Sequence, residues 1–371
     1  MTTRLLYLVS HPIQYQAPLL RLISGQSDIV LRVIFERDTS DGYFDPGFGR
    51  AVCWDVPLRQ GYDSLTAAEA DLEREIAVAD VIWMHGWQGA WMRRALALAK
   101  KLNKPVLMRG ENTDAAMPDG SGWRGLAKRL YLRWLFRHIT VFLAVGSDNR
   151  GYYLRRGIAQ DRIFPMPYAV DNDTFAQCAI QADTADLRLK LGIAPNRPVI
   201  LFAGKLMPRK HPHTLLEAWR HSSWGGQAPV LLFVGDGIMA AQLHQHAGTD
   251  VIFAGFRNQA ELPAFYALAD IFVLASEAEP WGLAVNEAMA SGTAVIVGDR
   301  VGCAADLVTP DCGAVVPAGD VQALATAMVE LLPRAGDAGR AAARRIMQWD
   351  FAADIAGLRQ ALAWLKNTPC A

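Results

Sequence analysis

The feature that most constrains this chain is a series of short apolar runs separated by helical patterns. Five runs lie at residues 4–9, 29–35, 81–84, 105–109 and 139–145, and five more at 198–203, 229–234, 251–254, 271–274 and 294–297. Because the runs are apolar on both faces and do not alternate, they predict buried parallel strands with helices on both sides. The sequence therefore predicts an α/β fold with two doubly wound, Rossmann-like domains.

The stretch between the two series has the composition of a domain boundary. It contains Pro165, Pro167, Pro195 and Pro198, together with the turn-rich residues 171–173. Proline and turn residues gather in linkers, and a chain of 371 residues fits two domains of ordinary size. We expect a ligand-binding cleft between these domains.

Charge and cysteine content exclude several classes of protein. Lys plus Arg and Asp plus Glu both number 37, so no overall positive charge favours nucleic acid as a partner. The five cysteines are odd in number, are scattered along the chain and form no C-x-x-C pair, which predicts reduced thiols. They are Cys53, Cys178, Cys303, Cys312 and Cys370. The apolar run after Arg4 is too short for a signal peptide, and no run is long enough to span a membrane. We expect a cytoplasmic protein.

Residues 36–63 form a long connection rich in glycine, aspartate and aromatic residues. Loops of this length inside compact domains are often functional, so the segment is a candidate for lining an acceptor site. A surface excursion stabilised by its own aromatic residues is an equal alternative.

Two carboxylates flank the start of a predicted helix in the second domain. Glu279 precedes the helix, Gly282 lets the backbone approach a ligand, and Glu287 lies one turn beyond Leu283. Free N–H groups at a helix start suit a phosphate, while carboxylates accept hydrogen bonds from sugar hydroxyls. The pattern fits a nucleotide-sugar site, and a solvated glutamate placed for the helix dipole is the alternative.

Basic residues follow the first strand of the second series. Lys205, Arg209 and Lys210 lie beyond residues 198–203, at the end of a strand where open α/β sheets bind ligands. Their charge suits a diphosphate, and an ordinary solvated basic loop is the alternative.

Several motifs within residues 198–332 occur in the same order as in a known protein family. Residues 279–292 resemble the Glu-x7-Glu motif of the retaining glycosyltransferase family 4, and Gly204–Lys205, Lys210 and segments 234–237 and 254–258 agree in order. The resemblance implies the GT-B architecture, in which two Rossmann-like domains face a central cleft and the last helix crosses back. It implies an acceptor domain at 1–170, a donor domain at 171–348 and a returning helix at 349–371.

The resemblance also implies roles for individual residues. Glu279 would contact the donor sugar, Glu287 the ribose hydroxyls, and Lys205 and Lys210 the diphosphate, with Glu279, Lys205 and Lys210 as the catalytic set. The other implied donor-binding positions are Gly204, Gly235, Phe256, Arg257, Trp281, Gly282 and Leu283. Lys205 stands where the family more often has Arg, Trp281 where Phe is usual, and residues 301–306 where a glycine pair precedes Pro-Glu.

The amino-terminal half resembles the family only in outline. Its first strand lacks the usual glycine pair, so His11, Gln14 and Tyr15 occupy that space, and Arg109 and Glu111 stand where many members have a histidine. Together with His85, these residues are candidates for acceptor binding or charge stabilisation because they follow strand ends. For His11 and His85, a structural imidazole at a strand end is an equal alternative.

Two further patterns each have a simpler explanation. Residues 235–240 match the dinucleotide fingerprint G-x-G-x-x-A, but the strand is not the first of its domain and the expected acidic residue is not well placed. Residues 123–138 form a basic, aromatic helical pattern suited to a membrane surface, whereas a helix packed on the sheet with a charged outer face gives the same pattern and is favoured.

The site residues and the resemblance together predict a hexosyltransferase that moves a sugar from a nucleoside diphosphate to a hydroxyl acceptor, and the resemblance implies that the anomeric configuration is retained. The acceptor would be a glycan, a glycolipid or a small hydroxyl compound, in cell-envelope, polysaccharide or glycolipid synthesis, and a soluble acceptor is an equal alternative to a lipid-linked one. A related epimerase or hydrolase and a non-catalytic nucleotide-sugar-binding protein are the alternatives. We expect no metal and no cofactor, since the lysines supply the neutralising charge. Peripheral contact with the inner face of the membrane through 123–138 remains open.

Overall fold

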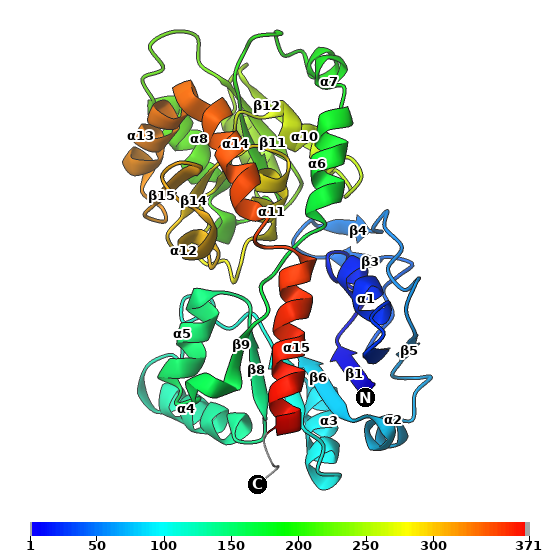
Figure 1. Cartoon of the computed structure of the whole chain (residues 1–371). Helices are drawn as coiled ribbons and strands as arrows, with labels where there is room; N and C mark the ends of the chain where they lie inside the picture. Colours follow the sequence, from blue (N-terminus) through cyan, green and yellow to red (C-terminus); the bar gives the residue numbers. More distant parts are fainter. Residues whose placement is uncertain (1, 368–371) are drawn as a thin grey trace. The chain divides into compact units, whose positions relative to one another are not determined.

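The structure, a computed structural model, describes residues 2–367 and contains two units (Figure 1). The first unit comprises residues 1–42, 56–168 and 351–371, and the second comprises residues 43–55 and 169–350. Residues 43–55 belong to the second unit although the chain on either side of them belongs to the first. The sequence did not indicate this insertion.

The first unit is built on a parallel sheet of seven strands in the order β5-β2-β1-β6-β7-β8-β9. Its strands are β1 (Thr3–Val9), β2 (Ile29–Phe35), β5 (Ser64–Thr66), β6 (Val81–His85), β7 (Val106–Arg109), β8 (Val141–Ala144) and β9 (Ile163–Pro165). Its helices are α1 (Gln16–Ser24), α2 (Leu72–Val78), α3 (Ala90–Lys101), α4 (Gly122–Phe136), α5 (Ser147–Arg155), the short η1 (Gln160–Arg162) and α15 (Phe351–Asn367).

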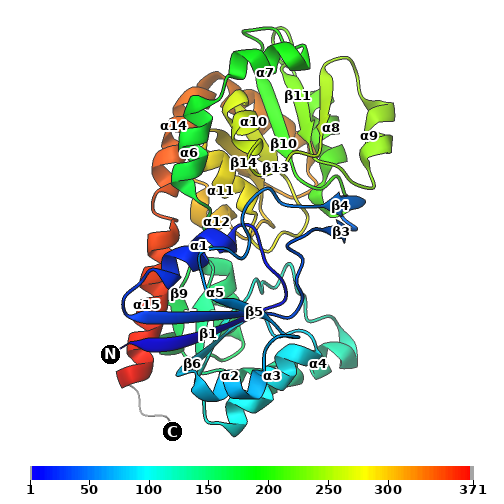
Figure 2. The ribbon, with the colours of Figure 1, turned by 90° about the vertical axis from the view of Figure 1, so that its right-hand side faces the viewer.

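Helices cover both faces of this sheet (Figure 2). One face packs a core of Leu6, Leu8, Ile82 and Met108 against apolar residues of α2 to α5, and α1 and α15 lie together on the other face. A side chain in place of Gly357 of α15 would put its Cβ 1.6 Å from the carbonyl oxygen of Pro165. The last helix therefore packs directly on the end of β9, as predicted for a helix that returns to the first domain.

The second unit is built on a parallel sheet of six strands in the order β12-β11-β10-β13-β14-β15. Its strands are β10 (Val199–Ala203), β11 (Val230–Val234), β12 (Val251–Gly255), β13 (Ile271–Leu274), β14 (Ala294–Gly298) and β15 (Gly313–Val316). Its helices are α6 (Asn172–Gln181), α7 (Thr184–Leu191), η2 (Pro208–Lys210), α8 (Pro212–His221), α9 (Ala240–His246), α10 (Leu262–Leu268), α11 (Leu283–Ala290), α12 (Ala304–Leu307), α13 (Val321–Leu331), η3 (Leu332–Arg334) and α14 (Ala335–Ile346). Residues 43–55 add an antiparallel hairpin of β3 (Tyr43–Asp45) and β4 (Arg50–Val52).

The predicted α/β class and the ten predicted strands are confirmed. In each sheet the first strand of the series lies in the middle, with β2 and β6 beside β1 and with β11 and β13 beside β10. At such a point the direction in which successive strands are added to the sheet reverses. Ligands of open α/β sheets bind there, beyond the carboxyl ends of the strands. The topology therefore marks the ends of β10 and β13 in the second unit and of β1 and β6 in the first.

Two findings concern the whole described chain. Cys53, Cys178, Cys303 and Cys312 are free thiols, and Cys370 lies outside the described residues. No helix within residues 2–367 combines the length and the apolar character that a membrane span requires.

Candidate active site

The basic residues predicted to bind a diphosphate follow β10. Gly204 and Lys205 come directly after the strand, and Lys210 ends the short helix η2 before α8. The neighbouring strand β13 leads into the segment that carries Glu279. Because β10 and β13 are parallel neighbours, these residues lie at the same edge of the sheet, where the topology predicts a ligand.

The structure brings Lys210 and Glu279 into direct contact. Lys210 Nζ donates a hydrogen bond to Glu279 Oε2, and both side chains are largely buried. The backbone also links the two segments, because the N–H of Glu277 donates to the carbonyl of Arg209 at 2.9 Å. The predicted diphosphate lysine and the predicted sugar-binding carboxylate therefore form one cluster.

Lys205 is paired with a residue that the sequence did not single out. Its Nζ donates to Asp45 Oδ2 at 2.8 Å, and it lies 5.1 Å from the ring centroid of Phe48 in the same hairpin. Burial acts to raise the pKa of Asp45, but Lys205 and the N–H groups of Gly47 and Phe48 outweigh it and hold that pKa below its usual value. Asp45 is therefore ionised and opposes the charge of Lys205.

The loop that carries Glu279 is fixed by a second loop. The N–H of Glu279 donates to the carbonyl of Arg300, and the N–H groups of Gly302 and Cys303 donate to the carbonyls of Glu279 and Trp281. A Cβ at Gly302 would lie 2.0 Å from the carbonyl oxygen of Pro280. Residues 300–303 thus hold the Glu279 segment in place, a role that sequence reasoning did not assign.

Helix α11 begins at the predicted motif. Gly282 is its N-cap with φ of 101°, and a Cβ there would lie 2.8 Å from Val301, so only glycine fits. Leu283 begins the helix and is half-buried. Trp281 is only 2% exposed and donates its indole N–H to Asn286, so its ring packs inside the unit. Its predicted role at the donor stays a prediction.

Glu287 is a buried carboxyl group in α11. It is 8% exposed and accepts a 2.7 Å hydrogen bond from the hydroxyl of Tyr266. Burial raises the pKa of Glu287 to about 7, and the hydrogen bonds from Tyr266 and Gln259 offset only part of that effect. A group that is costly to ionise and lies in a predicted site is a candidate for function.

The remaining predicted donor positions surround the ends of β10, β11 and β12. Gly235 follows β11, and a Cβ there would lie 1.9 Å from the carbonyl oxygen of Gly204. Phe256 follows β12 and packs edge-on against Phe48 at 5.1 Å, while Arg257 bonds the carbonyl of Ala254 and pairs with Glu261. These residues share one end of the sheet with Lys205.

His85 lies at the end of β6 in the first unit, in a polar network. The hydroxyl of Tyr7 lies 2.9 Å from its Nδ1, and the hydroxyl of Tyr168 lies 3.1 Å from its Nε2. Gln16 lies 3.2 Å from Nδ1. Burial, with the nearby charge of Arg109, lowers the pKa of His85 to about 3, so the ring is neutral. The geometry favours the structural interpretation of His85.

Three other acceptor candidates, His11, Gln14 and Tyr15, follow β1, and a fourth, Glu111, follows β7. Tyr15 donates to Glu111 at 3.3 Å, which joins two of them, and burial raises the pKa of Tyr15 far above its usual value. His11 lies 2.8 Å from the hydroxyl of Ser10, and burial, then Arg37, lowers its pKa. Gln14 is half-buried.

Arg109 is buried inside the first unit. Its Nη2 bonds the carbonyls of Met166 and Pro167 and pairs with Asp354 of α15 at 2.6 Å. Both side chains of the ion pair are 1% exposed. This geometry favours a structural role for Arg109. That Arg109 binds the acceptor or stabilises charge stays a prediction.

Within residues 2–367, no group of three or more His, Cys, Asp or Glu side chains is placed to hold a metal ion. The ammonium groups at the predicted donor site are those of Lys205 and Lys210, each beside one carboxylate. The site therefore has two ammonium groups that a bound anion can engage.

Comparison with known proteins covers both units. Residues 183–343 match the family described as Glycosyl transferases group 1, and residues 28–169 match the Glycosyl transferase 4-like domain. A Mycolicibacterium smegmatis protein, described as a GDP-mannose-dependent alpha-(1-6)-phosphatidylinositol monomannoside mannosyltransferase, is 31% identical over 291 residues, 74% of this chain and 74% of that protein.

Two further matches agree with this one. A Corynebacterium glutamicum protein, described as a GDP-mannose-dependent monoacylated alpha-(1-6)-phosphatidylinositol monomannoside mannosyltransferase, is 32% identical over 251 residues. That alignment spans 62% of this chain and 64% of the relative, less than two thirds of its length. The structure of Anabaena Alr3699/HepE with UDP and glucose has a TM-score of 0.74 at 17% identity, over 97% of this chain and 99% of that one. This chain therefore belongs to the group 1 glycosyl transferases of family 4 and has their GT-B fold.

Proposed function

We propose that the protein is a retaining glycosyltransferase that moves a hexose from a nucleoside diphosphate to a hydroxyl acceptor, in cell-envelope, polysaccharide or glycolipid synthesis. The observation that carries the proposal is that Lys205, Lys210 and Glu279 all lie beyond the carboxyl ends of the neighbouring strands β10 and β13, with Lys210 paired to Glu279. Two ammonium groups neutralise a diphosphate, and a carboxylate binds sugar hydroxyls.

The proposed reaction breaks the bond between the anomeric carbon and the diphosphate oxygen. The acceptor oxygen forms its bond to that carbon on the same face, and its proton passes to the leaving phosphate. Lys205, Lys210 and the free N–H groups at the start of α11 stabilise the charge on the diphosphate. Glu279 orients the sugar, and Glu287 binds the ribose hydroxyls. Gly204, Gly235, Phe256, Arg257, Trp281, Gly282 and Leu283 complete the proposed donor site.

The names of the relatives suggest where to begin with substrates. Both curated relatives are described as GDP-mannose-dependent and as acting on a phosphatidylinositol monomannoside. We take GDP-mannose as the first donor to test and a glycolipid as the first acceptor. On the acceptor side, the candidates lie at or just beyond the ends of β1, β6 and β7, and they are His11, Gln14, Tyr15, His85, Arg109 and Glu111.

We also propose that the protein is cytoplasmic and contacts the inner face of the membrane through residues 123–138. Support comes from four large apolar side chains of α4 that face solvent, namely Trp123, Leu126, Leu130 and Trp134, each more than half exposed. An apolar stripe on a basic helix is typical of interfacial helices. A glycolipid acceptor would lie in that membrane.

Ligand-induced thermal stabilisation tests the donor site, because a ligand that binds the native state raises apparent stability. The purified chain is heated with UDP, GDP, ADP and their sugar conjugates, alongside Lys205→Ala and Glu287→Ala. Lys190→Ala, on the surface of α7 in the same unit, is the matched control. We expect one nucleotide to stabilise the wild type and the control but neither site variant. If none stabilises the wild type, the donor site is misplaced.

A transfer assay then tests the reaction. GDP-mannose labelled in the sugar is incubated with the protein and a glycolipid extract, and the anomeric configuration of the labelled product is determined by NMR. Transfer with retention supports the proposal. Free sugar formed at the same rate with and without acceptor indicates a hydrolase.

A further inference from the structure

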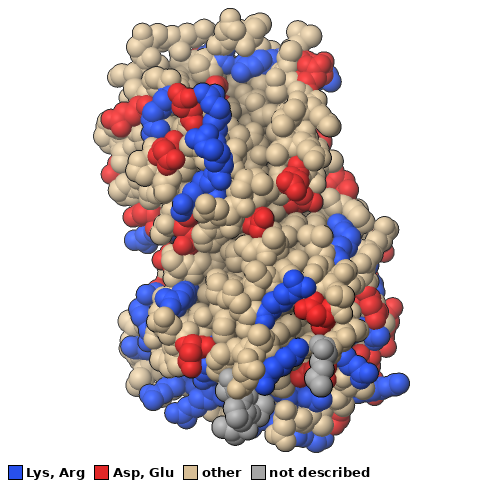
Figure 3. All heavy atoms as spheres, in the orientation of Figure 1, with Lys and Arg blue, Asp and Glu red and all other residues tan. Residues whose placement is uncertain are grey.

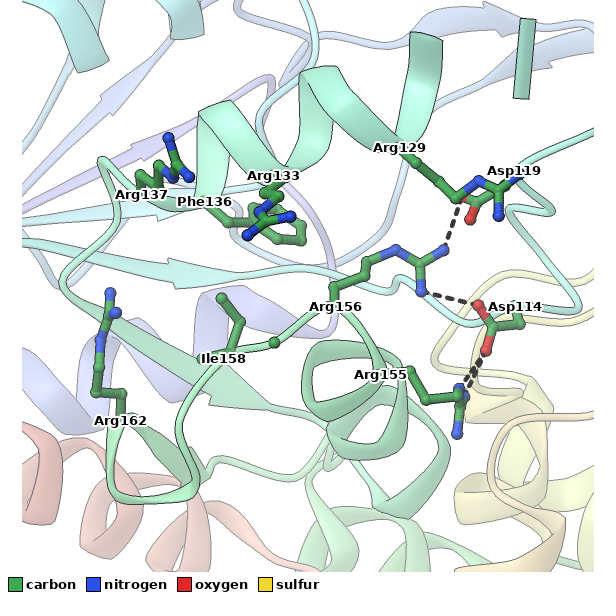
Figure 4. Close-up of a pocket in the computed structure, with 11 residues that line it drawn as sticks. Asp114, Asp119, Arg129, Arg133, Phe136, Arg137, Arg155, Arg156, Ile158 and Arg162 are labelled. Atoms are coloured by element: carbon green, nitrogen blue, oxygen red, sulfur yellow. Dashed lines mark hydrogen bonds and ion pairs between the residues drawn. The ribbon is translucent and has the colours of Figure 1, made fainter. Parts of the chain in front are cut away.

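The first unit contains a pocket of about 710 Å³ outside the acceptor candidates (Figure 4). Six arginines line it, namely Arg129, Arg133, Arg137, Arg155, Arg156 and Arg162. The first three project from α4 and the turn after it, and the others come from the end of α5 and from η1. Phe136 and Ile158 are its apolar lining residues.

The charges in this pocket are unbalanced. Asp114 and Asp119 are its acidic lining residues; Asp114 pairs with Arg155 and Arg156, and Asp119 pairs with Arg156. Arg162 donates to the backbone carbonyl groups of residues 139 and 140. Four positive charges therefore remain without a carboxylate in the lining, in a chain whose formal net charge is zero.

Arg133 and Arg137 are the residues most available to a ligand. Both are exposed, and among residues 2–367 neither makes a side-chain hydrogen bond or ion pair. Two guanidinium groups held one helical turn apart, with no carboxylate between them, repel one another until an anion binds. A guanidinium group also matches a phosphate, because its planar N–H groups donate to two oxygens at once.

Helix α4 presents three different faces. Gly125, Leu132, Leu135 and Phe136 are buried against the unit, and the arginines at positions 129, 133 and 137 face the pocket. The third face carries the apolar side chains of Trp123 and Leu130, which are 75% and 59% exposed. In Figure 3, Lys and Arg side chains gather over α4 and α5. Helix α4 thus exposes apolar side chains beside its arginines, whereas an ordinary surface helix exposes a charged face alone.

We propose that the pocket between α4 and α5 binds the phosphate of an anionic phospholipid headgroup while the apolar face of α4 enters the bilayer surface. Charge complementarity favours a phosphate group, and the exposed apolar side chains beside it favour one that belongs to a lipid rather than a free ion. The inference deepens the membrane contact proposed above and rests on it, but it does not depend on sugar transfer.

Vesicle sedimentation tests this proposal with the full-length protein. The vesicles contain phosphatidylcholine alone or with 30 mol% phosphatidylglycerol, about a third of the lipid, a content chosen so that the surface is clearly anionic. The test variant is Arg133→Gln with Arg137→Gln. The matched control is Arg93→Gln with Arg94→Gln, two exposed arginines of α3 in the same unit, which removes the same charge. A third variant, Leu126→Ser with Leu130→Ser, tests the apolar face.

We expect the wild type to prefer the anionic vesicles. The Arg133/Arg137 variant should lose about 30-fold in partitioning, which corresponds to about 1 kcal/mol for each of two charges at the surface. The α3 control should lose much less, and the leucine variant should weaken binding to both kinds of vesicle. Equal losses in the two arginine variants, or no preference for anionic vesicles, would overturn the proposal.

A second arm separates a lipid headgroup from a soluble anion. Thermal stabilisation is measured with sn-glycerol 1-phosphate and with inorganic pyrophosphate, for the wild type and the Arg133/Arg137 variant. Stabilisation that requires these arginines, without vesicle binding, would mean that the pocket takes a soluble phosphate and the proposal is wrong. Stabilisation of the wild type by nucleotides is measured on the same preparation, so a failure at the pocket is distinguished from a failure of the donor site.

Discussion

Asp45 accepts a hydrogen bond from Lys205 at 2.8 Å although 160 residues separate them in the sequence. The carboxylate comes from the β3–β4 hairpin, and it is also fixed by the N–H of Gly47 at 2.8 Å. Asp45 is only 5% exposed, so its carboxylate is shielded from solvent, while the side chain of Lys205 is 31% exposed. The carboxylate of Asp45 thus pairs with the lysine that the proposed function assigns to the diphosphate.

This relationship predicts that Asp45 competes with the donor. In Asp45→Asn the amide oxygen can keep the bond to Gly47, while the charge that holds Lys205 is lost. We expect the affinity for the nucleoside diphosphate to rise about tenfold, since a hydrogen bond to a charged group contributes about 1.5–3 kcal/mol. Isothermal titration calorimetry with the nucleotide that stabilises the wild type measures this affinity in both proteins. An affinity as low as that of Lys205→Ala would instead mean that Asp45 positions the lysine.

The contact between Lys210 and Glu279 predicts a loss of catalysis when the carboxylate is neutralised. Glu279→Gln keeps the size of the side chain but removes the charge that pairs with Lys210. We expect kcat/KM for sugar transfer to fall about 100- to 1000-fold, the usual effect of removing one preorganised electrostatic contact. Glu277→Gln, two residues away with a side chain that is 61% exposed, is the control. Comparable losses in both variants would place the effect in the loop and not in Glu279.

The raised pKa of Glu287 predicts a stability that depends on pH. The pKa lies at about 7 in the folded protein and near 4.5 in the unfolded chain, so the folded state binds the proton more tightly. The contribution of this group to the free energy of unfolding therefore falls as pH rises from about 4.5 to about 7, by about 3 kcal/mol in all.

Urea unfolding of Glu287→Gln checks this directly. The amide has no charge to bury, so the variant should be more stable than the wild type at pH 8.5 and similar to it at pH 4.5. Glu330→Gln, an exposed carboxylate of α13, should follow the wild type at both values. If the free energy of unfolding of Glu287→Gln differs from that of the wild type by the same amount at both pH values, the effect comes from packing and not from ionisation.

Local patterns in the sequence predicted much of the fold and part of the site. The runs at 198–203 and 271–274 became neighbouring central strands, and this alone brings Lys205 and Glu279 to one edge of the sheet. The residue types at strand ends thus indicated the donor site, because the carboxyl ends of parallel strands lie at the same edge of a sheet.

Relationships between distant segments could not be predicted in the same way. Nothing local in residues 43–55 indicates that Asp45 meets Lys205, and nothing near residue 300 indicates that its carbonyl fixes Glu279. The helical period of 123–138 showed an arginine stripe and an apolar stripe, but not which of them the surrounding chain covers. Only the packing of α4 shows that the arginines face a pocket and that Trp123 faces solvent.

The buried ion pair of Arg109 and Asp354 yields the last prediction. It joins β7 to the returning helix α15 within the first unit, with both side chains 1% exposed. Removing one partner leaves a buried charge without compensation, which typically costs about 3–5 kcal/mol. We expect Asp354→Ala to destabilise this unit by that amount, measured by thermal unfolding, whereas Asp28→Asn, which breaks an exposed pair with Arg359 of the same helix, should change little.

The double variant separates the two roles considered for Arg109. Replacing the pair by Arg109→Met and Asp354→Leu removes both charges together, so much of the stability should return, because an apolar pair of similar volume often matches a buried ion pair. If Arg109 only fixes α15, the double variant should also recover sugar transfer. If Arg109 binds the acceptor or stabilises charge in the reaction, the double variant will be folded and inactive, and the structural interpretation of this residue will be wrong.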